Sequence, residues 1–208
     1  MIAIVDYGVG NLFSLKRSLN AIGIASVVTA DSAEIARAEK IILPGVGAFA
    51  DAIEKLRKTG LDRVLCLEAE KGKPLLGICL GMQLLFDKSF EYGEHQGLGL
   101  IPGSVQPIAG VIPAEYKIPH IGWNALRFKK ESPLFQGVKE GDCVYFVHSY
   151  YAADCAADTV ATAEYGAELT AAVQRKNVFG CQFHPEKSGS VGLNILRAFA
   201  GLKEEDLC

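Results

Sequence analysis

The stretch PLLGICLGMQLLF, residues 74–86, decides how the first half of this chain is interpreted. An apolar run ends at Ile78, Cys79 follows with a glycine two positions away on each side, and a second apolar run starts at Leu80. The first run indicates a buried strand and the second indicates the beginning of a helix. Whether this strand-to-helix turn belongs to a series depends on the sequence around it.

Strand and helix patterns alternate through the first half of the chain. Apolar runs that indicate further buried strands occupy residues 2–8, 26–30 and 40–45. Helical patterns occupy residues 11–23 and 31–39, and one long helix is expected over about 48–71. Strands joined by helices in this order pair in parallel. The pattern therefore predicts an α/β fold with an open, mostly parallel central sheet flanked by helices.

The second half of the chain has a different texture. From about residue 97, shorter β-type segments alternate with Gly and Pro turns, which indicates some antiparallel strands, and residues 190–202 form a closing amphipathic helix. The chain contains no internal repeat, no low-complexity segment and no evident linker. We therefore expect a single domain over residues 1–208.

Composition and charge argue against several classes of protein. Half of the 208 residues are hydrophobic and 22% are charged, which predicts a substantial core rather than disorder. The net charge is −3 and no run of Lys and Arg could follow a phosphate backbone, so no nucleic-acid partner is expected. No stretch of about 18 uncharged apolar residues is present, which predicts no membrane span. The six cysteines form no C-x-x-C pair, which favours reduced thiols and a cytoplasmic location.

Cys79 has the setting of a nucleophile. The segment 77–81 is a G-x-C-x-G sequence between a strand and a helix, the layout of the G-x-S-x-G nucleophile elbow with sulfur in place of oxygen. The start of a helix favours the thiolate, which is the reactive form. The alternative is an ordinary buried cysteine in an apolar segment, and spacing alone leaves that alternative open.

A thiolate nucleophile needs a base, and His184 is the best placed of the four histidines. It ends a β-type run directly before Pro185, which puts its imidazole at the end of a strand, where ligand crevices of α/β sheets lie. Glu186 could hold the other ring nitrogen, as the third member of a triad does. Alone, the segment would favour an ordinary strand-end histidine followed by a solvated turn. His148 lies in an apolar strand, which favours a satisfied core histidine. The chain has no His, Cys and acid spacing typical of a metal site, so none is expected.

The motifs around Cys79 and His184 resemble those of a known family. GICLGMQ at 77–83 and HPE at 184–186 are similar to the class I, or triad, glutamine amidotransferases, and the resemblance covers essentially the whole chain. Further motifs narrow it to the glutaminase subunits of imidazole glycerol phosphate synthase, from histidine biosynthesis. These motifs are DYGVGN at 6–11, LPGVGAF at 43–49, PHIGWN at 119–124, FVHSYY at 146–151 and HPEKSG at 184–189.

The resemblance implies a reaction and a set of roles. Cys79 would attack the side-chain amide of glutamine and form a γ-glutamyl thioester, while His184 would protonate the leaving ammonia and then activate water. Glu186 would orient His184. No cofactor is implied. The oxyanion hole would be formed by amides at Leu80, Val46 and Gly47. Glutamine would be held by Gly45, Gly47, Gln83, Ser149 and Tyr150. Rotation of the Gly45–Gly47 backbone is a hypothetical switch for the activity.

The family resemblance also implies a partner. A cyclase subunit with a (β/α)₈ barrel would form a heterodimer with this chain and receive its ammonia, which would otherwise be protonated in bulk water. The residues assigned to this interface are Asn11, Pro119, His120, Trp123, Tyr145 and Lys187.

Two alternatives stay open at this point. One is a glutaminase subunit that serves another acceptor, such as the one in anthranilate synthase, although PHIGWN and LPGVGAF favour the first assignment. The other is a non-catalytic binding subunit, against which the complete set of Cys79, His184 and Glu186 argues.

Overall fold

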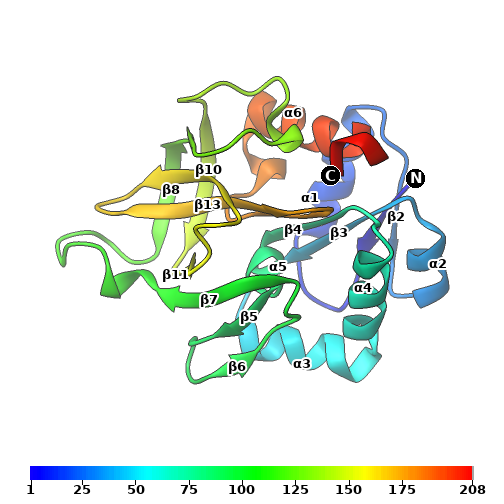
Figure 1. Cartoon of the computed structure of the whole chain (residues 1–208), viewed down its shortest axis with the longest axis horizontal. Coiled ribbons are helices and arrows are strands. Elements are labelled where there is room, and N and C mark those ends of the chain that lie inside the picture. Colours follow the sequence, from blue (N-terminus) through cyan, green and yellow to red (C-terminus); the bar gives the residue numbers. More distant parts are fainter. Residues whose placement is uncertain (208) are drawn as a thin grey trace.

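The computed structural model describes residues 1–207, so Cys208, one of the six cysteines counted above, lies outside the described residues. Within that range the central sheet has eight strands in the order β2-β1-β3-β4-β14-β13-β12-β9 (Figure 1). The parallel part consists of β2 (Ser26–Thr29), β1 (Ile2–Val5), β3 (Lys40–Gly45), β4 (Leu75–Cys79) and β14 (Val178–Cys181). The antiparallel part consists of β13 (Glu168–Arg175), β12 (Thr159–Glu164) and β9 (Arg127–Phe128). The predicted fold class is confirmed.

Helices cover both faces of this sheet, as Figure 1 shows. One face carries α1 (Leu12–Ala21) and α6 (Gly189–Gly201), and the other carries α2 (Ser32–Arg37), α3 (Phe49–Thr59) and α4 (Leu61–Glu70). The alternation of side chains along each strand divides the core accordingly. In β1, for example, Ile2 and Ile4 pack in the first core, whereas Ala3 and Val5 pack in the second. Burial on both sides explains why β1 is apolar without interruption.

The long helix expected over residues 48–71 is two helices, so that prediction was wrong in this respect. Gly60 adopts a left-handed conformation with φ 73°, and its amide donates to the carbonyl of Arg57 at 3.1 Å. A glycine in this conformation ends a helix without steric cost. The chain then changes direction and α4 begins at Leu61. The apolar periodicity therefore continues across Gly60, although the helix axis changes there.

The helix expected after Cys79 is also shorter than predicted. α5 covers only Leu80–Gln83, because the carbonyls of Leu84 and Leu85 accept from the amides of Leu98 and Leu100, in the segment that leads into a strand of an adjacent sheet layer. That layer is a four-stranded sheet of β11 (Tyr150–Ala153), β7 (Ile101–Pro107), β5 (Phe86–Ser89) and β6 (His95–Gln96). A two-stranded ribbon is formed by β8 (His120–Ala125) and β10 (Cys143–His148).

Short 3₁₀ turns complete the described chain. They lie at η1 (Ile108–Gly110), η2 (Pro133–Phe135), η3 (Pro185–Lys187) and η4 (Glu204–Leu207). None of the helices described in residues 1–207 is long and apolar enough to cross a membrane.

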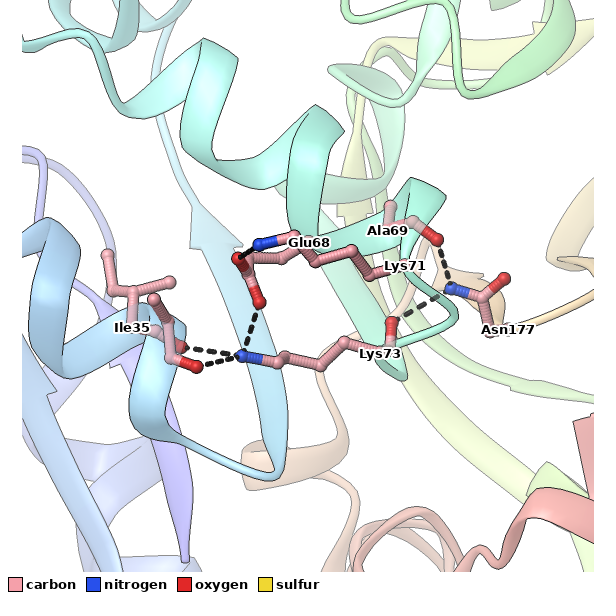
Figure 2. A network of polar contacts seen from close by, with 7 residues as sticks. Ile35, Glu68, Ala69, Lys71, Lys73 and Asn177 are labelled. Carbon is pink, nitrogen blue, oxygen red and sulfur yellow. Dashed lines mark hydrogen bonds and ion pairs between the residues drawn. The ribbon is translucent and has the colours of Figure 1, made fainter.

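A buried polar network closes the end of the sheet where β4 and β14 begin (Figure 2). The carboxylate of Glu68 is almost fully buried and pairs with Lys73 at 2.6 Å and with the more exposed Lys71 at 2.7 Å. Burial raises the pKa of Glu68, but the hydrogen bonds and charges of the two lysines outweigh burial and lower it. Lys73 also donates to the carbonyl of Ile35 in α2, and Asn177 donates to the carbonyl of Lys73 at 2.9 Å. The network therefore ties α2 and α4 to the amino end of the sheet.

Candidate active site

The carboxyl end of β4 presents Cys79 on a tight turn. Cys79 has φ 55° and ψ −111°, a conformation that costs energy for a residue with a side chain, and it is 7% exposed. A Cβ atom at Gly81 would lie 1.8 Å from the carbonyl oxygen of Leu43, and one at Gly77 would lie 2.6 Å from the carbonyl oxygen of Gly81. Both glycines of the G-x-C-x-G sequence are therefore required by the close packing of the segment after Cys79 against β3 and β4.

His184 and Glu186 lie beyond the end of β14, next to β4 in the sheet. His184 Nδ1 donates to Glu186 Oε1 at 2.8 Å, and the two side chains are 2% and 3% exposed. His184 Nε2 has no hydrogen-bond partner among the described residues. The carboxylate therefore fixes the ring orientation and leaves Nε2 free for proton transfer.

The surroundings of His184 favour its charged form. Burial by itself lowers the pKa of His184, but the interactions of the ring with Cys79 and Glu186 outweigh burial and raise it to about 9. A positive imidazolium between a sulfur anion and a carboxylate is the arrangement that activates a cysteine nucleophile.

Two glutamine side chains complete the surroundings of the sulfur. Gln182 is fully buried, and its Nε2 donates to Cys79 Sγ at 3.7 Å. Gln83 donates through its Nε2 to Gln182 Oε1 at 3.0 Å and to the carbonyl of Tyr150 at 3.1 Å. Gln182 was not among the predicted site residues, although a polar residue in the apolar run 178–183 was a usable signal.

A cavity of about 370 Å³ opens over Cys79 and contains most of the predicted residues. The predicted residues that line it are Val46, Gly47, Cys79, Leu80, Gln83, Pro119, Ser149, Tyr150, His184 and Lys187. Glu91, Val147 and His148 line it as well and had not been predicted as site residues. A larger hollow of about 720 Å³ lies over residues 128–136, but no cysteine or histidine lines it. The smaller cavity is therefore the candidate site.

Glu91 brings a carboxylate into this cavity from the loop after β5. Its Oε2 accepts a hydrogen bond from the amide of Phe49 at 2.5 Å, at the start of α3. The amino end of a helix is a favourable place for a negative charge. The loop around Glu91 has no sequence pattern that indicates a site, so only the tertiary contact reveals it.

The loop 44–47 contains one fixed and one free glycine. Tyr7, from the DYGVGN motif, donates through its hydroxyl to the carbonyl of Pro44 at 2.9 Å, and burial followed by the charge of Cys79 raises the pKa of this tyrosine. A Cβ atom at Gly45 would lie 2.7 Å from the amide nitrogen of Gly81, so Gly45 packs against the elbow and lies outside the cavity lining. Gly47 has φ 95° with open space around it, and Val46 is 42% exposed.

Three of the residues predicted to face a partner form one exposed group. Trp123 is 54% exposed, its ring lies 5.9 Å from that of Tyr145, and Lys187 Nζ lies 5.8 Å from the Tyr145 ring. Pro119 lies in the cavity lining nearby. Asn11 lies apart from this group, in a small hollow behind the triad that His184 and Glu186 also line.

The structure does not bring His120 to that surface. The ring is 1% exposed because it stacks between Phe146 and Tyr165, and Nδ1 lies 3.0 Å from His148 Nε2. Burial lowers the pKa of His148 to about 4, despite a hydrogen bond to the carbonyl of Tyr150. His148 is thus a buried core histidine, as expected from its strand, although it also lines the cavity. No group of three or more potential metal ligands exists among residues 1–207.

Comparison with known proteins agrees with this geometry. A family model described as glutamine amidotransferase class-I matches residues 3–200. The chain is a class-I glutamine amidotransferase. Relatives of this amidotransferase include "Imidazole glycerol phosphate synthase subunit HisH" of Caldanaerobacter subterraneus subsp. tengcongensis, 52% identical over 96% of the chain and 97% of that protein. The protein of the same name from Geobacillus thermodenitrificans is 51% identical over 97% of the chain and 96% of that protein.

Solved structures share the fold of this amidotransferase at low sequence identity. One described as "Crystal structure of glutamine amidotransferase" has a TM-score of 0.75 at 19% identity and covers 97% of this chain and 100% of its own. Another, "Structure of PurLQS from Thermotoga maritima", has a TM-score of 0.71 at 22% identity and covers 95% and 96% of the two chains. The predicted family and enzyme class are confirmed, and the relatives' names confirm the predicted function of a subunit of imidazole glycerol phosphate synthase.

Proposed function

We propose that this amidotransferase is the glutaminase subunit of an imidazole glycerol phosphate synthase and supplies ammonia for histidine biosynthesis. One observation carries the proposal: the chain is about half identical, over nearly its whole length, to several proteins that bear the name of this subunit. The buried contact between His184 and Glu186 beside Cys79 supports a catalytic rather than a binding role.

The reaction proceeds on Cys79. The thiolate attacks the side-chain carbonyl carbon of glutamine, and the tetrahedral intermediate collapses to a γ-glutamyl thioester as His184 Nε2 gives its proton to the leaving ammonia. His184 then accepts a proton from water, which attacks the thioester, and glutamate leaves with Cys79 restored. Glu186 holds Nδ1 throughout, which leaves Nε2 free for both proton transfers.

The cavity offers complementary groups for the rest of glutamine. The amide of Leu80 follows the nucleophile directly, and the amides of Val46 and Gly47 can meet it across the developing oxyanion. Glu91 is an anion suited to the α-ammonium group. Because Gln83 Nε2 is committed to protein acceptors, its Oε1 is the atom left for the substrate, beside the backbone of Ser149 and Tyr150. Gly45 supports the loop from behind.

The loop 44–47 provides a switch. Gly47 has open space around it and a φ that glycine adopts at no cost, whereas Tyr7 and Gly45 anchor the preceding residues. Rotation of the Val46–Gly47 peptide therefore changes the oxyanion hole without moving Cys79. Such a rotation would couple glutamine hydrolysis to events on the exposed side of the loop.

The partner is a cyclase subunit with a (β/α)₈ barrel, which forms a heterodimer with this chain in the cytoplasm. The exposed group of Trp123, Tyr145 and Lys187 borders the cavity, because Lys187 also lines it, and Pro119 lines the cavity nearby. This position suits an interface that keeps ammonia from bulk water. Tryptophan and tyrosine are common anchors of such interfaces. Residues 1–208 act as a single amidotransferase domain in this assembly.

Glutamate release from glutamine tests the proposal. The purified chain is assayed alone, with the matching cyclase subunit, and with that subunit and its nucleotide ligand, and Cys79→Ala serves as the control. A strong rise in the complete mixture that the variant lacks is expected. High activity of the chain alone would point to another type of amidotransferase, and no activity in any mixture would point to a non-catalytic subunit.

A further inference from the structure

The side chain of Gln182 has no part in the triad, yet it is fully buried against the nucleophile. Its Nε2 lies 3.7 Å from Cys79 Sγ, and its backbone amide donates to the carbonyl of Ala171 in β13 at 2.8 Å. The strand pairing holds the residue between β4 and β13, so the side chain has no route to solvent. A buried amide needs partners for its own polar atoms, and its partners decide which atom faces the sulfur.

The hydrogen bonds leave one orientation for this amide. The carbonyl of Tyr150 can only accept, so Gln83 must present Nε2 to it, at 3.1 Å. The second hydrogen of the same nitrogen points to Gln182 at 3.0 Å and needs an acceptor there, which is Oε1. Gln182 therefore turns Nε2, its donor, toward Cys79. The carbonyl of Tyr150 thus fixes the orientation of the Gln83 amide, and Gln83 in turn fixes the orientation of the Gln182 amide.

We infer that Gln182 is a further catalytic residue, which stabilises the Cys79 thiolate by an N–H···S hydrogen bond, and that Gln83 is a positioning residue for it. The inference rests on the proposed function. A hydrogen bond to a charged acceptor is stronger than one to a neutral acceptor. The bond therefore favours the free thiolate over the thiol, and it holds Sγ in place between the elbow and His184.

A purely structural role makes a different prediction. One possibility is that the side-chain amides of Gln83 and Gln182 only satisfy each other's hydrogen bonds within the core. In that case an apolar side chain of the same length at position 182 changes the reactivity of Cys79 equally at all pH values. If Gln182 stabilises the thiolate, the loss of Cys79 reactivity is large at low pH, where the thiolate depends on the hydrogen bond from Gln182. The loss is small at high pH, where the thiol ionises without this hydrogen bond.

Alkylation of Cys79 by iodoacetamide in the full-length chain distinguishes the two roles. Rates are measured near pH 6 and near pH 9 by mass spectrometry of the peptide that contains Cys79. We expect Gln182→Met to slow alkylation by about tenfold near pH 6 and to approach the wild-type rate near pH 9. Gln83→Met should give the same pH dependence with a smaller amplitude, because Gln182 loses the partner that orients it.

Gln174→Met is the matched control, since Gln174 lies in β13 and donates to the carbonyl of Lys176, away from the cavity. It should match the wild type at both pH values. An unchanged profile for Gln182→Met, or an equal loss at both pH values, would overturn the inference. If Gln182→Met does not fold, as judged by circular dichroism, the profile of Gln83→Met decides in the same way. A wild-type Cys79 that resists iodoacetamide and shows no glutaminase activity would instead refute the proposed function.

Discussion

His184 and His148 line the same cavity, are almost equally buried and have opposite pKa shifts. The first is 2% exposed with a pKa raised to about 9, and the second is 6% exposed with a pKa lowered to about 4. Burial lowers both pKa values, so burial cannot explain the difference. Their partners do: His184 has Cys79 and Glu186 as neighbours, whereas His148 contacts the carbonyl of Tyr150 and the ring of His120, and the charges of His120 and His184 lower its pKa further. Charge at a buried site is set by its neighbours.

The difference has a chemical use. The positive charge on His184 helps to keep His148 neutral, because like charges in one cavity raise each other's energy. His148 therefore does not compete with His184 for a proton. Each partner in this arrangement can be removed separately.

The largest effect is expected from Glu186→Gln, which removes the anion that orients His184. By analogy with other triads, kcat/KM for glutamine hydrolysis in the activated complex should fall on the order of 10⁴-fold. The pKa of His184, followed by NMR, should fall as well, since one of its two anionic neighbours is gone. Retained activity with a lowered pKa would show that charge on His184 is not needed for the reaction.

Lys73→Met extends the comparison to a buried carboxylate, Glu68, at the other end of the sheet (Figure 2). Lys73 is mostly buried, so its loss leaves Glu68 with one exposed partner and should lower the free energy of unfolding by about 3 kcal/mol in urea titrations. Lys71→Met, which removes the exposed partner, should cost less than about 1 kcal/mol. Equal costs would mean that burial of the partner does not matter here.

The acid side of the stability profile should depend on His148. Its pKa is lower in the folded state than in the unfolded state, so the unfolded chain binds the proton first as the pH falls below about 6.5. Between about pH 6.5 and pH 5 the wild type should lose about 2 kcal/mol through this group. His148→Gln should lack that loss, so the difference in the free energy of unfolding between variant and wild type should become smaller as the pH falls. Parallel profiles would contradict the low pKa.

The sign for His184 is reversed. Its folded pKa is above the unfolded value, so its contribution to stability is complete below about pH 6.5 and is lost as the pH rises through 9. In the Glu186→Gln variant, the free energy of unfolding measured in urea should therefore depend less on pH at alkaline pH. Its dependence on pH at acid pH should still show the contribution of His148.

The smallest effect concerns His120. Burial lowers the pKa of His120, and the hydrogen bond with Asn124 at 2.7 Å partly opposes this. Asn124→Ala removes the opposing contact, so the pKa measured by NMR should move further down. A rise would show that burial is not the dominant influence on this ring.

Much of the architecture followed from local patterns. The alternation of apolar runs and helical segments identified β1 to β4 but not β14, a parallel strand in the half where antiparallel strands were expected. Gly77 and Gly81 around Cys79 identified the elbow, because that turn needs glycines at a set spacing. Residue 184 was recognisable because a strand ended there beside a proline. These features are encoded by neighbours in the chain, so reading along the chain was sufficient for them.

Other features were decided only by the tertiary structure. His120 was assigned to the partner interface from the sequence, yet the pairing of β8 with β10 and the ring of Tyr165 bury it. Glu91 is held at the cavity by Phe49, which is 42 positions away in the sequence, and Gln182 is held beside Cys79 by Gln83, which is 99 positions away. The change of chain direction at Gly60 was also not predicted, because the apolar periodicity continues from α3 into α4. Sequence patterns report what a residue is and how its neighbours are spaced, whereas burial, charge state and partners depend on which distant segments the fold brings together.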